Sequence, residues 1–395
     1  MTEAQLFEGA ALADGLSPAL RKPVSVLVAD GILAEIFDGP APASARAGAR
    51  IIDASGATIV PSMVDCHSHL TLQGGAQWVA RGADPTADLV DAAERNAAAL
   101  IAAGIRWVRD VGSPRRADTP DGHERALALS LRDLWQGKPG YPYVRAAGTW
   151  VTRGGSLPPG LSVEVQDGDG LLAASLAQLD DGADLIKLYL DGPDAGIAPW
   201  SAHEVRRVVE AVHARGATVA AHGTGLANCR LAAEAAVDTL EHGFTIDADV
   251  ARILAANRVT VVSTLSVLHS VLGFGSTTTI DRFTAPAGRQ RTAERLEVAE
   301  QSVRTAHAAG LAIAAGSDFG GGSVRAGHLA WEVECLVRAG LEPWEALGAA
   351  TWRGGDVLRD PHAGRLTVGG PAHFTLVHGD PLSDPAALWR VWRAL

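Results

Sequence analysis

Eight short apolar runs spaced along the middle of the chain constrain its fold more than any other feature. Each run has the length and composition of a buried strand, and segments of helical period lie between them, such as residues 86–104 and 201–216. The runs are "TIVPSMVDCH", "GIRWVRDVG", "YVRAAGTW", "GADLIKLYL", "GATVAAH", "AVDTLEHG", "RVTVVSTL" and "GLAIAAGSD". Glycines typical of helix C-termini precede several runs, at Gly104, Gly182, Gly216 and Gly310. This alternation predicts an α/β fold, the (β/α)8 or TIM barrel.

The two ends of the chain have a different pattern, with short alternating strands broken by turns. Residues 24–36 ("VSVLVADGILAEI") contain an Asp-Gly pair at Asp30 and Gly31, which predicts a tight hairpin. The stretch "GRLTVGGPAHFTLVHGD" near the other end has a similar pattern. We therefore expect residues 1–57 and 364–395 to form a small β-sandwich domain made from both chain ends, and residues 58–363 to form the barrel.

Charge and composition argue against several classes of function. The formal net charge is −11 and no stretch is rich in lysine or arginine, so we expect no nucleic-acid and no membrane partner. The three cysteines form no CxxC pair, which argues against a disulfide scaffold and a cysteine-based zinc site. No apolar run is long enough to span a bilayer, and we find no signal-peptide pattern, so we expect a cytoplasmic protein.

Side chains that can bind metal lie at the ends of several predicted strands. In a barrel, the C-terminal ends of the strands meet on one face, where active sites are found. The candidates are His67 and His69 on the first run, Lys187 in the fourth, His222 on the fifth, His242 on the sixth and Asp318 on the eighth. Alternation along a strand points His67 and His69 to the same side. Four imidazoles and a carboxylate suit zinc, and also manganese, cobalt, nickel or iron.

Lys187 is the unusual member of this set. A lysine ammonium has no lone pair and cannot bind a metal, and a lone charge inside "LIKLYL" would be costly in a buried strand. The residue makes chemical sense if CO2 carboxylates its amine, because the resulting carbamate is anionic and has two oxygens that can bridge two ions.

These six positions resemble the binuclear, carboxylated-lysine form of the amidohydrolase superfamily. That pattern is His-x-His on the first strand, lysine on the fourth, histidine on the fifth and sixth, and aspartate on the eighth. The local runs "GADLIKLYL", "AHGTG", "VDTLEHGF" and "AGLAIAAGSDFG" are similar to the imidazolonepropionase-like and prolidase-like branch. The stretches "RAGLEPWEALGAATWRGGDVL" and "GRLTVGGPAHFTLVHGDPLSDP" resemble its closing helices and its returning β strand. The resemblance covers nearly the whole chain.

The resemblance implies a metal-dependent hydrolase that cleaves a C–N bond of a small N-acyl amino acid, a dipeptide-like compound or a cyclic amide. In this reading His67, His69, Lys187 and Asp318 bind one ion, and the carbamate of Lys187 binds the second with His222 and His242. A hydroxide shared by the two ions attacks the carbonyl, and Asp318 transfers the proton to the leaving nitrogen. Relatives are often dimers or larger, so a homo-oligomer is expected.

The sequence argues against some alternative functions of the same site and leaves others open. Deaminases of the superfamily usually carry a glutamate three residues after the fifth-strand histidine, and here Gly225 follows His222 at that place. A lactonase or phosphotriesterase would use the same ligands and stays open. A non-catalytic relative would have lost ligands, and none is lost here. The run from Thr152 to Ser156 lacks the histidine of the Gly-Gly-His element common in prolidase-like members, so their dipeptidase specificity is not carried over.

Further residues near the predicted site receive weaker assignments. We expect Tyr189, two residues past Lys187, to line the pocket, and Arg325 and His328 to contact substrate. Asp65 faces the same side as His67 and should support the metal ligands from behind. Glu241 precedes His242, so we expect it to face away from the metals and to have a structural role.

Overall fold

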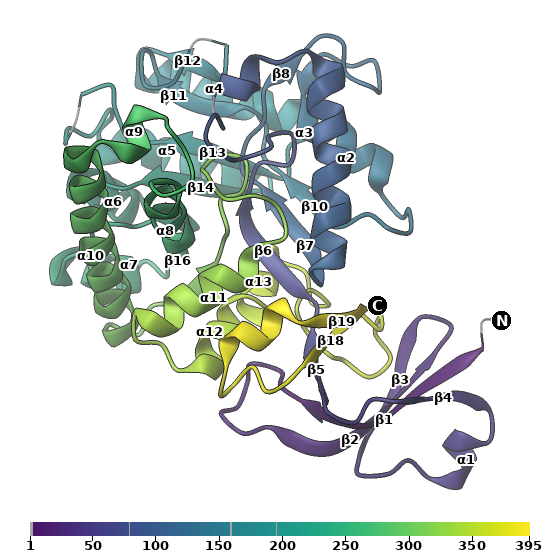
Figure 1. Cartoon of the computed structure of the whole chain (residues 1–395). Coiled ribbons are helices and arrows are strands. Elements are labelled where there is room, and N and C mark those ends of the chain that lie inside the picture. Colours follow the sequence, from purple (N-terminus) through teal and green to yellow (C-terminus); the bar gives the residue numbers. More distant parts are fainter. Residues whose placement is uncertain (1–2, 79, 159, 195) are drawn as a thin grey trace.

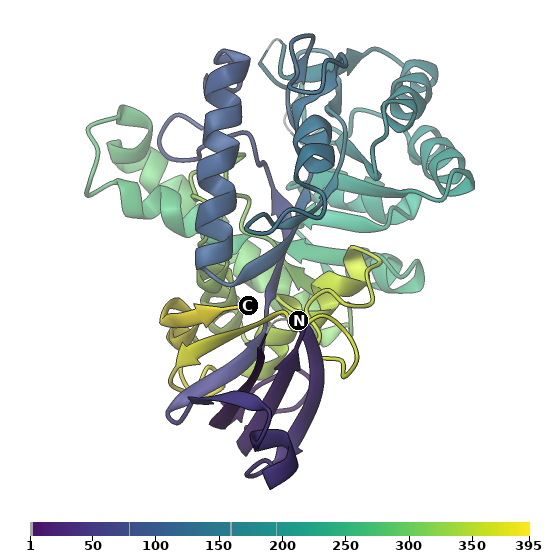
Figure 2. The ribbon, with the colours of Figure 1, turned by 90° about the vertical axis from the view of Figure 1, so that its right-hand side faces the viewer.

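The computed structural model describes residues 3–78, 80–158, 160–194 and 196–395. A body of parallel strands wrapped by helices makes up most of the molecule, and a smaller sheet built from both chain ends projects from it (Figure 1). Both ends of the described chain lie on the side of the molecule that carries this smaller sheet (Figures 1 and 2).

The smaller sheet joins the two ends of the chain. Its strands run in the order β19-β18-β5-β1-β2-β3, with β4 paired to β1. They are β1 (Ala4–Leu12), β2 (Arg21–Ala29), β3 (Ile32–Asp38), β4 (Ala49–Asp53), β5 (Ala57–Pro61), β18 (Phe374–His378) and β19 (Val391–Ala394). The predicted hairpin is confirmed, because Ala29 pairs with Ile32 across Asp30 and Gly31, both at positive φ. Hydrogen bonds connect all seven strands into one sheet, and that this sheet folds into a small β-sandwich stays a prediction.

The body contains two parallel sheets whose strand order largely follows the chain. One has the order β10-β7-β6, and the other β12-β11-β13-β14-β15-β16-β17. The strands are β6 (Met63–Ser68), β7 (Ile105–Asp110), β10 (Tyr143–Ala146), β11 (Trp150–Arg153), β12 (Ser162–Val165), β13 (Leu185–Tyr189), β14 (Thr218–Gly223), β15 (Thr239–His242), β16 (Thr260–Ser263) and β17 (Ile313–Ala315). Isolated parallel bridges link the two sheets, from Ala147 to Leu185 and from Ser68 to Phe319.

Two of the expected strands are divided. The first run breaks at Ser62, so that β5 belongs to the smaller sheet and β6 to the body. The third run separates into β10, which pairs with β7, and β11, which leaves to pair with β13 and β12. In both places one apolar run forms two strands with different partner strands. The alternation of residues along the chain carries no information about these partners.

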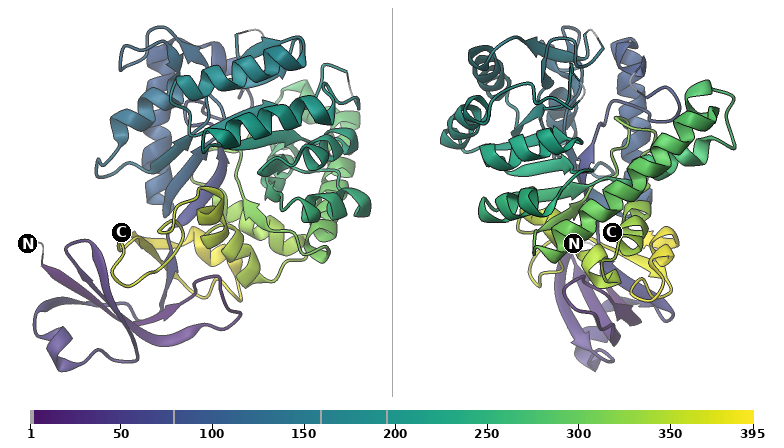
Figure 3. Two further views of the ribbon diagram at one scale, coloured as in Figure 1. Left: turned by 180° about the vertical axis from the view of Figure 1, so that it is seen from behind. Right: turned by 90° about the vertical axis from the view of Figure 1, so that its left-hand side faces the viewer.

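Helices cover the outside of the parallel strands (Figures 1 and 3). The longer ones are α2 (Thr86–Ala102), α3 (Leu127–Trp135), α4 (Gly168–Asp180), α5 (Ala202–Ala214), α6 (Leu226–Ala235), α7 (Ala248–Ala256), α8 (Leu265–Phe274), α10 (Pro286–Ala308) and α11 (Leu329–Arg338). The shorter ones are α1 (Ala43–Arg46), α9 (Asp281–Thr284), α12 (Pro343–Ala349) and α13 (Trp352–Val357). Among the described residues, no helix combines the length and the apolar character needed to cross a membrane.

Helix α5 shows why these segments fold as they do. Ser201 and Glu204 form a reciprocal capping box at its start, which satisfies backbone N–H groups that have no partner within the helix. Its buried residues are Val205, Val208, Val209 and Val212, a spacing that places them on one face against the strands. The chain turns at Gly216, whose φ of 78° is accessible to glycine at little cost, and enters β14.

Candidate active site

The structure brings the six candidate ligands together at one end of the parallel strands. His67 lies near the end of β6 and His69 just after that strand. Lys187 lies in β13, His222 in β14, His242 at the end of β15, and Asp318 just after β17. All are buried except His222, which is partly exposed. Ligand atoms of His67, His69 and Asp318 lie within 4.8 Å of one another, an arrangement that could hold a metal ion. The His222 and His242 rings lie 4.4 Å apart between centroids.

The two histidines of the first strand are oriented by hydrogen bonds from their far nitrogens. Nδ1 of His67 donates to Oε2 of Glu241 at 2.7 Å, and Nδ1 of His69 donates to the carbonyl of Gly112 at 2.8 Å. Their Nε2 atoms therefore carry the lone pairs, and these lie 3.5 Å and 3.3 Å from Oδ1 of Asp318. Three acceptor atoms that converge without a proton between them form a fitting site for a cation.

His222 and His242 are held in the same manner. Nε2 of His222 donates to Oδ2 of Asp191 at 3.1 Å, and Nδ1 of His242 hydrogen-bonds to Oγ1 of Thr264 at 2.8 Å. The other ring nitrogen of each histidine is left free to bind a metal. Burial acts against the charged form of Asp191, but His222 and Thr224 hold its pKa well below the usual range. We did not predict Asp191, although its place two residues past Tyr189, the last residue of β13, was a usable signal.

Burial also sets the protonation of the candidate ligands. It is the main cause that lowers the pKa of His67 and of His242 well below the usual value, and the nearby Lys187 adds to it. Both imidazoles are therefore neutral near pH 7 and can offer lone pairs to a metal. Burial likewise lowers the pKa of Lys187 to about 8. Its Nζ is buried and has no hydrogen-bond partner among the described residues, which is uncommon for so polar an atom.

Glu241 does not face away from the site, so that expectation was wrong. Its carboxylate is fully buried and accepts hydrogen bonds from His67 and from Nη2 of Arg109 at 2.7 Å. Burial alone would raise the pKa of Glu241, but Arg109 and Lys187 outweigh it, so the pKa is lowered. The alternation fails because His242 adopts a φ of 70°, which turns its side chain to the same side as that of Glu241.

We expect Glu241→Gln to reduce metal affinity by about 10- to 100-fold, because His67 loses the carboxylate that orients it. Arg109 would also lose its partner in the protein interior, which should lower the free energy of unfolding by about 3–5 kcal/mol. Metal content after dialysis and urea unfolding measure the two effects. Glu35→Gln, an exposed change in β3, is the matched control. Unchanged metal content in Glu241→Gln would show that Glu241 does not position His67.

Asp65 supports the backbone beneath the ligands. Oδ1 of Asp65 accepts from the backbone N–H of Ser317 at 2.9 Å and of His67 at 3.3 Å, and its Oδ2 accepts from the Ser317 hydroxyl. Burial raises the pKa of Asp65 to about 7. Asp65 thus links the strand of His67 to the segment that carries Asp318, without contacting an imidazole ring in the described structure.

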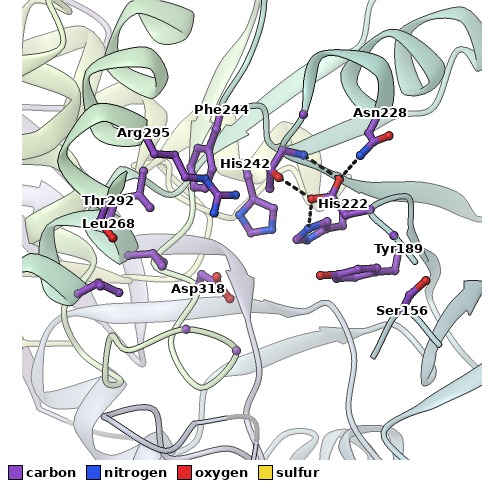
Figure 4. A pocket seen from close by; sticks show the side chains of 18 of the residues that line it. Ser156, Tyr189, His222, Asn228, His242, Phe244, Leu268, Thr292, Arg295 and Asp318 are labelled. Carbon is purple, nitrogen blue, oxygen red and sulfur yellow. Dashed lines mark hydrogen bonds and ion pairs between the residues drawn. The ribbon is translucent and has the colours of Figure 1, made fainter. Parts of the chain in front are cut away.

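A cavity of about 910 Å³ opens onto the candidate ligands (Figure 4). Its lining includes His222, His242 and Asp318 at the base, with aromatic and polar side chains around them: Trp78, Ser156, Tyr189, Asn228 and Phe244. A smaller cavity of about 170 Å³ adjoins them and is lined by His67, His69 and Lys187 among others. The candidate metal ligands therefore lie where a small molecule could reach them.

Of the three predicted substrate contacts, one lines the cavities and two do not. Tyr189 lines both cavities and stacks on His222, with ring centroids 4.0 Å apart. Arg325 and His328 line neither cavity. His328 instead precedes α11 and packs against Trp389, and the Arg325 guanidinium lies beside Gly75. No residue of this loop beyond Gly322 lines either cavity, and contact of Arg325 and His328 with substrate stays a prediction.

Arginines from another part of the chain line the large cavity instead. Arg282 lies in α9, and Arg291 and Arg295 lie in α10. We did not single them out, because a helix rich in charged residues resembles any solvated helix in the sequence.

Gly321 gives the ligands room, because a Cβ at this position would overlap the ring of His69 and lie 2.6 Å from Oδ1 of Asp318. We expect Gly321→Ala to displace these ligands and to lower activity by about 10²-fold, with little change in the urea midpoint. Activity, bound metal and urea unfolding measure this. Gly273→Ala is the control, since a Cβ there meets no atom within 4 Å. Equal activity in both variants would contradict the close approach.

Comparisons with known proteins show a family match and structures of similar fold. A model of the amidohydrolase family matches residues 58–392. The structure is similar to that of a Xaa-Pro dipeptidase with methionine bound in its active site, with a TM-score of 0.84 and 26% identity over 99% of this chain and 98% of that chain. It also shares its fold with Aspergillus niger ochratoxinase, with a TM-score of 0.79 and 19% identity over 100% of this chain and 94% of that chain.

Relatives found by sequence have 28% or 29% identity to this chain, close to the 26% of the dipeptidase structure. The chain is 29% identical over 327 residues to an uncharacterized protein of Mycobacterium tuberculosis, which covers 80% of this chain and 78% of that protein. It is 28% identical over 233 residues to the Aspergillus niger ochratoxinase, which covers 55% of this chain and 46% of the enzyme.

Proposed function

We propose that this chain, which belongs to the amidohydrolase family and is a hydrolase, cleaves the amide bond of a small N-acyl amino acid, dipeptide-like or cyclic amide substrate with the help of two divalent metal ions. The observation that carries the proposal is the convergence of four histidines, Asp318 and the partnerless amine of Lys187 at one cavity. We further infer that the parallel strands close into a (β/α)8 barrel, since isolated bridges link the two sheets at both sides.

The residues divide into two ligand sets. His67, His69, Asp318 and Lys187 would hold one ion, and His222, His242 and Lys187 the other. Zinc suits this nitrogen-rich set best, and manganese, cobalt, nickel or iron would also fit.

Lys187 is proposed to be carboxylated. The lone pair of its neutral amine attacks the carbon of CO2. An N–C bond forms while one C=O π bond breaks and its electron pair moves to oxygen, and a proton passes from Nζ to water, which gives an anionic carbamate. Support comes from the burial of Nζ without a hydrogen-bond partner, because a carbamate between two cations would remove that unfavourable state.

The chain's own groups can perform the remaining steps. When bound, the ions act as Lewis acids that polarise the substrate carbonyl and lower the pKa of water. Asp318 is proposed to accept the proton of the attacking water at a carboxylate oxygen and to pass it to the leaving nitrogen. Tyr189 keeps its proton, because burial and the nearby Asp191 raise the pKa of its phenol. It can therefore donate a hydrogen bond to bound substrate.

A metal count followed by a substrate screen tests the proposal. We expect about two ions per chain by mass spectrometry after growth with zinc or manganese, and hydrolysis of members of a panel of N-acyl amino acids, dipeptides and cyclic amides. Fewer than one ion per chain would contradict the binuclear site. Cleavage of lactones or phosphotriesters without any amide hydrolysis would contradict the proposed bond type.

A further inference from the structure

One wall of the large cavity carries two exposed arginines that form no ion pair with a carboxylate in the described part of the chain. Helix α10 contributes Arg291 and Arg295, four residues apart and so on the same face of the helix. Among the described residues, no carboxylate lies within 4.0 Å of either guanidinium. Two like charges at this spacing repel each other and disfavour the helix. An anionic partner in the cavity would relieve that repulsion.

Arg295 is held in place beside the candidate ligands. Its guanidinium carbon lies 5.1 Å from the ring centroid of Phe244, a buried residue two positions after His242. Figure 4 shows the Arg295 side chain pointing into the cavity towards His242. A guanidinium that rests on an aromatic ring still presents its N–H edges to a ligand in a fixed direction.

The carboxylates that line the cavity are committed elsewhere. Asp191 accepts hydrogen bonds from His222, Thr224 and Asn228. Asp318 is a candidate metal ligand that faces His69. Neither can balance Arg291 or Arg295, although the whole chain has a net charge of −11. The cavity is thus locally cationic within an acidic protein.

We propose that Arg291 and Arg295 bind a side-chain carboxylate of the substrate, additional to any α-carboxylate, so that the preferred substrates carry an acidic side chain. This inference rests on the proposed amide hydrolysis for its choice of substrates. A planar guanidinium can bind both oxygens of a carboxylate, and such charge-assisted pairs are strong enough to discriminate a carboxylate from its amide isostere.

Isosteric dipeptides test the inference on the metal-loaded enzyme. We compare kcat/KM for Ala-Glu with Ala-Gln, where the extra carboxylate is on the amine side, and for Glu-Ala with Gln-Ala, where it is on the acyl side. The acidic member of at least one pair is expected to be preferred by about tenfold or more. Arg295→Gln and Arg291→Gln should reduce that preference. Arg304→Gln, on the same helix but bonded to Gln301, should not.

Equilibrium binding gives a readout independent of turnover. In calorimetric titrations of the metal-loaded enzyme, L-glutamate is expected to bind about tenfold more tightly than L-glutamine, and Arg295→Gln should remove the difference. Equal kcat/KM within both dipeptide pairs, or a preference unchanged in both arginine variants, would overturn this inference and leave amide hydrolysis intact. Selective glutamate binding without hydrolysis of any amide would overturn the proposed function and support the anion site. Neither hydrolysis nor selective binding would overturn both.

Discussion

Replacing Asp318 by asparagine is expected to lower kcat by roughly 10²- to 10⁴-fold while the protein keeps much of its metal. The amide can still offer an oxygen to a cation, but it cannot accept a proton near neutral pH. Oδ1 of Asp318 lies 3.3 Å from Nε2 of His69, so an isosteric change leaves the shape of the site intact. Steady-state kinetics on an amide found by the screen, together with a metal count, measure the two quantities.

The control for this variant is Asp38→Asn. Asp38 lies in the smaller sheet and pairs with Arg21 at the surface, so its change alters net charge equally without touching the site. Full activity in Asp318→Asn would rule out Asp318 as the group that transfers the proton. Loss of all metal together with activity would show that it acts as a ligand alone.

Lys187→Ala is expected to lose more than about 10²-fold in activity and to regain part of it when formate, acetate or propionate is added. Truncation removes the proposed bridging carbamate and leaves space in a buried strand. A short carboxylate can enter that space and supply two oxygens in the same region. Activity measured against the concentration of added acid checks this result. No loss, or a loss that no acid reverses, would contradict the bridging role.

The small number of lysines in the chain makes it simple to detect carboxylation of Lys187 directly. It contains only three lysines, and Lys22 and Lys138 are exposed while Lys187 is buried. Protein grown or incubated with ¹³C-labelled bicarbonate should give a carbamate carbon signal in NMR that is absent in Lys187→Ala. Lys138→Ala should keep the signal. A signal that persists in Lys187→Ala would come from another amine.

Features that depend on neighbouring residues were predictable from the sequence. The helical segments at residues 86–104 and 201–216 correspond to α2 and α5, because apolar spacing and terminal glycines act within a few turns. The six candidate ligands meet at one cavity because each lies in a parallel strand or shortly after its C-terminal end.

Features that depend on distant partners or on one backbone angle were not predictable. The division of the third run into β10 and β11 follows from competition between β7 and β13 for pairing. That His242 lies on the same side as Glu241 follows from the positive φ of His242, which breaks the alternation of the strand. Arg295 belongs to the site because α10 packs near Phe244, a contact between segments that are distant in the sequence.

The segment that leads into the strand of His67 is synthesised early, but one of its partner strands is synthesised late. β5 leads through Ser62 into β6, and β18 pairs with β5 from the far end of the chain. Thr58 donates a hydrogen bond to the carbonyl of Gly379, 321 residues later. On the ribosome, this pairing must wait until synthesis has passed that residue. His67 is thus synthesised early, but the segment before it gains its β18 partner only near the end of synthesis. We therefore expect metal to be taken up after translation rather than by the nascent chain.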